Sequence, residues 1–155
     1  GDYEGAEVVY RELVRRGQHM PEVLGGLAHC LLLQERDLGE ALRVTRQALK
    51  TGGQGSASLP LRLTLAEALL LRGKPGKARS EMEDLEVPEG DAFLEARFEW
   101  VYALLAWNDG DLEDAGDHFD EVATLDPKGG LGDLARERIA EIEDEEPEDE
   151  PRVAG

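Results

Sequence analysis

The side chains best suited to metal binding or nucleophilic chemistry are few and scattered along this sequence. The three histidines, His19, His29 and His118, lie far apart, and the single cysteine is Cys30. His29 and Cys30 are adjacent, so on a helix their side chains would point about 100° apart and would not form a natural pair of zinc ligands. We therefore expect no metal site.

Glycine-rich and acidic segments also lack the spacing that ligand binding requires. The run Gly52-Gly53-Gln54-Gly55 has no strand before it and no Lys-Ser or Lys-Thr after it, as a phosphate-binding loop would. Asp109 and Asp111 lack the spacing of a twelve-residue calcium loop. No serine stands in a local nucleophile motif. The sequence thus predicts no catalytic residue and no cofactor, and a protein that is not an enzyme.

The charge of the chain argues against several classes of partner. The formal net charge is −18, and residues 91–155 hold 21 acidic and 5 basic side chains. Such a field repels phosphate backbones and anionic lipids, so we expect neither nucleic-acid binding nor membrane insertion. No apolar run approaches the ~20 residues of a membrane span. The first residues show no signal peptide, and Cys30 lies in an apolar run, so we expect a cytoplasmic protein.

The spacing of apolar residues predicts an all-α protein, because no alternating strand pattern occurs anywhere. We expect a single helix over residues 1–18, helix pairs over 21–50, 59–87 and 92–126, and a capping helix over 131–145. Residues 51–58 are predicted to be a flexible loop. The acidic, proline-broken tail over 146–155 is predicted to be disordered, since it offers little apolar area to bury.

An internal repeat organises the chain. Four segments share turn residues, an alanine, a residue four positions later and an apolar residue three positions after that. The four alanines, Ala6, Ala41, Ala78 and Ala115, are 35, 37 and 37 positions apart. Steps of four and three place each trio on one helical face. We expect each alanine to mark a point where a neighbouring backbone comes close.

This pattern resembles the tetratricopeptide repeat family, whose members repeat a helix pair of about 34 residues. The resemblance covers about residues 1–127, as three and a half repeats. The best match reads Tyr102-Ala103, Ala106, Gly110-Asp111-Leu112, Ala115, Phe119, Val122 and Pro127, with Glu99 where the family usually has Trp. Two further matches begin at Leu65-Ala66 and, with one extra turn residue, at Leu27-Ala28.

The resemblance implies a right-handed α-solenoid of antiparallel helix pairs that acts as a non-catalytic scaffold for protein–protein interaction. In such proteins the first helices of successive pairs line a concave groove that holds a peptide or helix of a partner. One subgroup clamps a C-terminal carboxylate with cationic residues. Leu33 and Leu71 stand where those cations would be, so we do not expect that clamp.

Helical geometry assigns residues to the expected groove. The predicted partner-binding residues are Leu63, Glu67, Leu70, Trp100, Leu104, Trp107 and Asn108. Large aromatic side chains are typical interface anchors, and the acidic second half of the chain favours a ligand that also bears Lys or Arg. The alternative for Trp100 and Trp107 is that both pack under the helix over 131–145 as core residues.

Two other functions remain open from the sequence. The chain begins on the second helix of a pair, which suggests that a partner helix precedes Gly1. The incomplete first repeat could then stack on another copy, making the chain a self-associating structural module. The third possibility is a regulatory repeat domain of a larger protein that also contains an enzyme.

Overall fold

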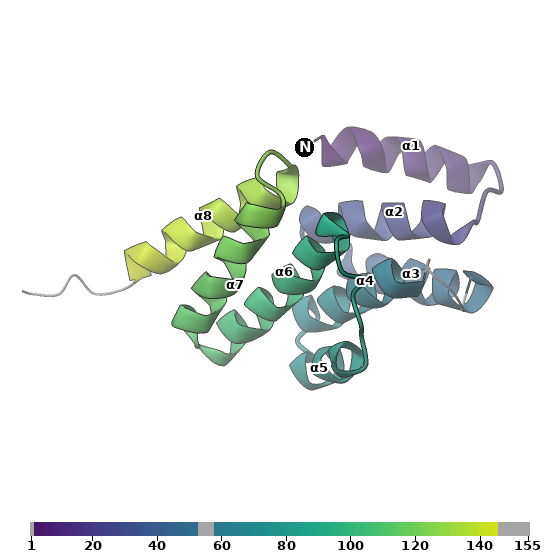
Figure 1. Ribbon diagram of the computed structural model, residues 1–155. Helices are drawn as coiled ribbons and strands as arrows, with labels where there is room; N and C mark the ends of the chain where they lie inside the picture. The colour runs from purple at the N-terminus through teal and green to yellow at the C-terminus, as the bar shows by residue number, and fades with distance from the viewer. Residues whose placement is uncertain (1, 53–57, 146–155) are drawn as a thin grey trace, which may run out of the picture. The chain divides into compact units, whose positions relative to one another are not determined.

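The computed structural model describes residues 2–52 and 58–145, and every regular element in these ranges is an α-helix (Figure 1). This confirms the all-α class. The helices described are α1 (Tyr3–Arg15), α2 (Pro21–Leu33), α3 (Leu38–Gly52), α4 (Ser58–Leu71), α5 (Pro75–Glu83), α6 (Ala92–Asp109), α7 (Leu112–Leu125) and α8 (Gly130–Glu145).

The helix boundaries follow the sequence closely, with one clear difference. A loop was expected over residues 51–58, but Thr51 and Gly52 belong to α3 and Ser58 begins α4. Gly52 lies so close to Pro21 that a Cβ atom would overlap the proline ring, so this contact holds the end of α3 against the start of α2. Residues 53–57, and the tail predicted to be disordered over 146–155, lie outside the described residues.

Contacts divide the chain into two compact units, Gly1–Leu94 and Glu95–Gly155. In the first unit each helix packs on the next along the chain from α1 to α5, and α2 also contacts α4. Both α2 and α4 are apolar on nearly all sides, and most of their residues are buried. A helix of that kind is packed on more than one side, so α2 and α4 form the centre of this unit.

The second unit is built on aromatic contacts and on a cap between helices. Phe119 of α7 is fully buried and meets the rings of Trp100 and Trp107 of α6 edge to face. The helices α7 and α8 pack on each other. The carboxylate of Asp126 accepts hydrogen bonds from the backbone N–H groups of Leu131 and Gly132 at 3.2 and 3.1 Å, which caps the first turn of α8.

The four repeat alanines occupy equivalent places in the structure. Each is the fourth residue of its helix, and its backbone N–H donates to the carbonyl oxygen of the residue before that helix. These bonds measure 3.1 Å for Ala6, 2.9 Å for Ala41, 3.1 Å for Ala78 and 3.0 Å for Ala115. The last three side chains are fully buried. The fourth residues of α2 and α8, Leu24 and Asp133, make the same bond, which belongs to the start of any α-helix. What the four repeat helices share is an alanine at this position.

Four helices, α1, α2, α4 and α6, end in the same way. After α4, the N–H of Gly73 bonds the carbonyl oxygen of Leu70 while that of Lys74 bonds Leu69. The same two bonds end α1 at Gly17, α2 at Glu35 and α6 at Gly110. These are Schellman motifs, in which the residue after the helix takes a left-handed conformation. The three glycines have φ of 80°, 74° and 79°, and Glu35 takes 49°.

Candidate binding surfaces

Three of the predicted groove residues lie on α4, and all three are buried. The exposed fractions of Leu63, Glu67 and Leu70 are 0%, 2% and 7%. Because α4 is apolar on nearly every side, it is covered on more than one side and presents no open face along these positions. The expectation of an accessible groove at these three residues does not agree with this burial.

The tryptophans of α6 differ from each other. Trp100 is only 6% exposed, and its ring centroid lies 5.3 Å from that of Phe119, so it is a core residue rather than an open anchor. Trp107 is half-buried, lies 5.9 Å from Phe119, and has the guanidinium carbon of Arg138 5.6 Å from its ring centroid. Arg138 belongs to α8, so Trp107 contacts the capping helix, as the core alternative expected. Trp107 is nevertheless half-buried and not a fully buried core residue.

The remaining two predicted groove residues are more accessible. Leu104 is half-buried and Asn108 is exposed, both on α6. One turn of α6 nearer its start, Glu99 accepts a hydrogen bond from Nδ1 of His118 at 2.5 Å. The His118 ring stacks on Tyr102 with centroids 5.8 Å apart. At the position where the resemblance predicts Trp, the chain therefore joins α6 to α7 with a polar contact. A role in binding stays a prediction for Leu104, Trp107 and Asn108.

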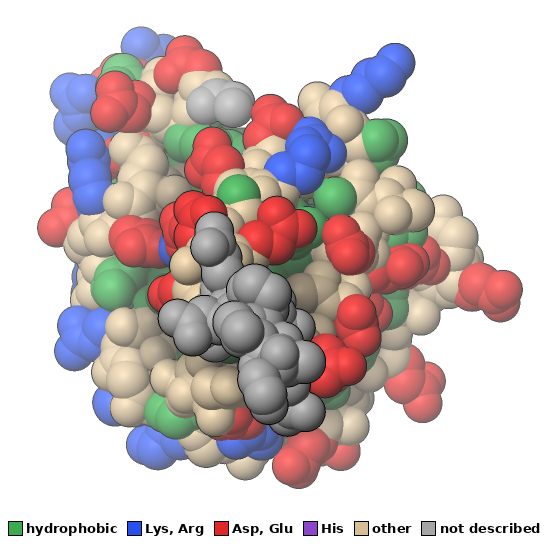
Figure 2. Space-filling view, turned by 90° about the vertical axis from the view of Figure 1, so that its left-hand side faces the viewer, with side chains coloured by type: hydrophobic (Ala, Val, Ile, Leu, Met, Phe, Trp, Pro, Cys, Tyr) green, Lys and Arg blue, Asp and Glu red, His purple; other side chains and the backbone are tan. Residues whose placement is uncertain are grey.

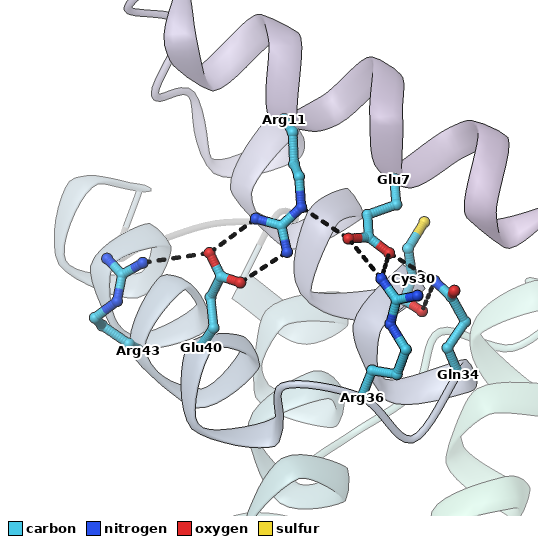
Figure 3. Close-up of polar contacts among 7 residues, drawn as sticks. All are labelled: Glu7, Arg11, Cys30, Gln34, Arg36, Glu40 and Arg43. Atoms are coloured by element: carbon cyan, nitrogen blue, oxygen red, sulfur yellow. Dashed lines mark hydrogen bonds and ion pairs between the residues drawn. The ribbon is translucent and has the colours of Figure 1, made fainter.

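A buried carboxylate at the centre of α1 organises a polar network that sequence analysis missed (Figure 3). Glu7 is 5% exposed. Its oxygens accept hydrogen bonds from Nε of Arg11 at 2.7 Å, Nε2 of Gln34 at 2.9 Å, and Nη2 of Arg36 at 3.0 and 3.2 Å. Gln34 also donates to the carbonyl oxygen of Cys30. The turn between α2 and α3 is thus tied to α1.

The network continues from α1 to α3 through Arg11. Its Nη1 and Nη2 donate to the two carboxylate oxygens of Glu40 at 3.1 and 2.8 Å. Arg43 lies 3.6 Å from Glu40 on the other side. Charges of alternating sign therefore run from Glu7 to Arg43.

Electrostatics within the network keep its acids ionised. The hydrogen bond from Arg11 lowers the pKa of Glu7, with smaller contributions from Gln34 and the charge of Arg36, and burial opposes them. Arg11 likewise lowers the pKa of Glu40. Burial, followed by the charge of Glu7, raises the pKa of the Cys30 thiol. Acids so fully occupied by cations are poor proton acceptors, so the network joins helices rather than performs catalysis.

Only part of this network had a signal in the sequence. Glu7 and Arg11 are four positions apart, the spacing of a helical ion pair. Arg36 and Glu40 are 29 positions away from Glu7 and Arg11, respectively. No local rule relates residues at that separation, because their proximity depends on how α1 packs against α2 and α3.

Two adjoining hollows lie beside this network in the first unit. The apolar hollow, of about 350 Å³, has Val14, Leu24, Leu27 and Val44 in its wall, with Arg11, Arg15, His19, Glu40, Arg43 and Gln47 completing it. The basic hollow, of about 540 Å³, is lined by Gly39, Leu42, Arg43, Arg46, Gln47, Lys50, Arg72 and Lys74. Because Arg43 and Gln47 line both, the two hollows adjoin each other.

Acidic side chains are numerous on the surface. On the face drawn in Figure 2, Asp and Glu side chains are spread over both halves of the view. Across residues 2–52 and 58–145, no group of three or more His, Cys, Asp or Glu side chains is placed to hold a metal ion. Within the same ranges, no helix has the length and apolar character to cross a membrane.

Comparison with known proteins identifies no relative. The sequence matches no family model and no curated protein, and no solved structure matches it.

Proposed function

We propose that this chain is a non-catalytic helical-repeat module that binds a segment of another protein. The observation that supports it most is the shared register of Ala6, Ala41, Ala78 and Ala115, each the fourth residue of its helix, with the last three side chains fully buried. Repeated units of this kind bury a shared core and leave an extended surface, and such surfaces serve recognition. A cytoplasmic, tetratricopeptide-like solenoid of antiparallel pairs is the form we propose.

The packing of the first unit is consistent with stacked pairs. Contact between α2 and α4, which skips α3, is what is expected when the first helices of successive pairs lie against each other. The charged groups of the Glu7 network are paired with one another, and the lining residues of the two adjoining hollows include no nucleophile–base pair. Binding therefore suits this surface better than catalysis.

The test is native capture followed by a direct binding measurement. The tagged full chain is used to retain proteins from a lysate, and each candidate is then purified and titrated by calorimetry against the folded chain. We expect one stoichiometric, saturable partner. Equal binding to the urea-unfolded chain, or no candidate that binds in purified form, would refute the proposal.

Self-association is the second candidate, because α1 exposes two apolar side chains. Val8 and Val9 are 68% and 58% exposed. A second copy packing on α1 would remove this area from water. Sedimentation over a range of concentrations tests it: a mass that rises with concentration in the native chain, and not in a Val8→Lys/Val9→Lys variant, would favour this function over partner binding.

A further inference from the structure

The two adjoining hollows differ in chemical character, and this combination indicates what they bind. The basic hollow contains five cationic side chains, Arg43, Arg46, Lys50, Arg72 and Lys74, and its lining includes no acidic residue. All five are exposed. Of these five cations, only Arg43 forms an ion pair within the described ranges, with Glu40 at 3.6 Å. Four cations are thus available to an anionic ligand on a chain whose formal net charge is −18.

The arrangement of these cations follows from the fold. Arg43, Arg46 and Lys50 are spaced by three and four positions, so they line one side of α3. Arg72 and Lys74 come from the turn between α4 and α5, and α3 packs against α4. A Cβ atom on Gly39 would lie 3.0 Å from Nη1 of Arg72, which shows how closely this turn approaches α3.

The adjoining apolar hollow distinguishes between the possible anions. Beyond Arg43 and Gln47 the wall becomes apolar, with Val14, Leu24, Leu27 and Val44. A polypeptide can place carboxylates among the cations and an apolar side chain in this hollow. A nucleic acid has no aliphatic group to place there, and its long phosphate backbone would also meet the negative field of the rest of the chain.

We propose that these hollows bind an acidic polypeptide segment of another protein, with a run of Asp or Glu in the basic hollow and an adjacent apolar side chain in the apolar hollow. The inference rests on the proposed function and names the partner class. It differs from the expectation drawn from the acidic second half of the chain, which was a basic ligand on the face of α4 and α6. The surface proposed here lies on α1, α3 and the α4–α5 turn.

The experiment uses short fluorescein-labelled peptides and the full chain. The probe is a run of glutamates followed by leucine and phenylalanine, titrated by fluorescence anisotropy at low salt. Three control probes replace the two apolar residues by serine, replace the glutamates by lysines, or are a single-stranded oligonucleotide of similar charge. We expect the acidic apolar peptide to bind best and the serine peptide more weakly. The affinity should fall as salt screens charges beyond ~10 Å at 0.1 M.

Matched variants locate the site. Arg46→Glu/Arg72→Glu should lower the affinity for the acidic peptide by roughly tenfold or more, since two exposed attractions become repulsions. Lys77→Glu reverses the charge of an exposed residue of α5 that lines neither hollow, and it should change binding little. Circular dichroism checks that the variants stay folded. Equal affinity of the double variant and Lys77→Glu would overturn the proposal, as would tighter binding of the lysine peptide or the oligonucleotide.

Other occupants are outcomes of the same experiment. If a chain ending at Glu145 bound the peptide at least tenfold more tightly than the full chain, residues 146–155 would be the occupant and a separate protein would be excluded. A concentration-dependent mass that Arg46→Glu/Arg72→Glu abolishes would make a second copy the occupant, with the same consequence. If the peptide did not bind while a purified natural partner did, this inference would be refuted and the proposed function would stand.

Discussion

Arg11 on α1 and Glu40 on α3 are joined by two parallel hydrogen bonds of 3.1 and 2.8 Å, although 29 positions separate them. The two side chains are 37% and 27% exposed, so solvent screens the pair in part. Because α1 packs on α2 and α2 on α3, this contact spans three consecutive helices. It connects the outer helix of the first unit to the repeat that follows.

A double-mutant cycle should measure this connection. We expect Arg11→Met and Glu40→Gln each to destabilise the chain, with a coupling between them of about 1 kcal/mol in urea unfolding. The coupling should shrink at high salt, because screening acts on the exposed part of the pair. A cycle on Arg136 and Asp133, an exposed pair within α8, should give less. Equal coupling in both cycles would contradict the role assigned to Arg11.

Acidic pH should lower the stability of the folded chain through its effect on Glu7. Its pKa is lowered from the ordinary value of 4.5 in the folded protein, so its contribution to stability is present above that value and is lost as pH falls through the lower folded pKa. Glu7→Gln should cost about 2 kcal/mol at neutral pH, since Arg11 and Arg36 lose a charged partner. The decrease in the free energy of unfolding between neutral and acidic pH, measured in urea, should be smaller for the variant than for the native chain. An unchanged acid profile would be incompatible with this role.

Two glycines in the second unit should respond oppositely to the same substitution. Gly110 has φ of 79°, and a Cβ there would meet no atom within 4 Å, so Gly110→Ala should destabilise by about 1 kcal/mol through backbone conformation alone. Gly116 lies within α7, also with open space around it. Gly116→Ala should stabilise by about 0.5–1 kcal/mol. Thermal melts compare the two, and shifts of the same sign would disprove this assignment.

The repeat alanines should not tolerate larger side chains. Ala78 and Ala115 are fully buried, and Leu at either position should cost roughly 1–3 kcal/mol by overpacking. Ala140 on α8 is exposed, so Ala140→Leu is the matched control and should stay within about 0.5 kcal/mol of the native chain. If melting temperatures of all three variants equal that of the native chain, the alanines are not close packing points.

Cys30 should react slowly in the folded chain. The residue is 4% exposed, and burial followed by the charge of Glu7 raises the pKa of its thiol from 9.0. Alkylation near pH 8 should therefore be far slower than in urea, with a rate set by opening of the structure. Because the folded pKa is raised, stability should decline as pH rises above the ordinary value. Equally fast alkylation with and without urea would refute the burial.

The sequence by itself determined the helices and their register. Apolar spacing, with glycine after a helix and Asp or Pro at its start, depends on local backbone physics, and local physics is readable from neighbouring residues. The side chains of Asp91 and Asp111 cap α6 and α7, and Pro75 begins α5. The spacing of the four alanines predicted a common register, and each of them is the fourth residue of its helix.

Only the tertiary structure decided which faces are buried and which charges meet. Leu63 and Trp100 were placed on an open face by helical geometry, but a helix that is apolar on all sides gives no signal of which side is covered. Arg11 and Glu40, like Arg46 and Arg72, come together because separate helices pack side by side. Contacts between residues so far apart in the chain depend on the packing of whole helices, and no local pattern in the sequence records them.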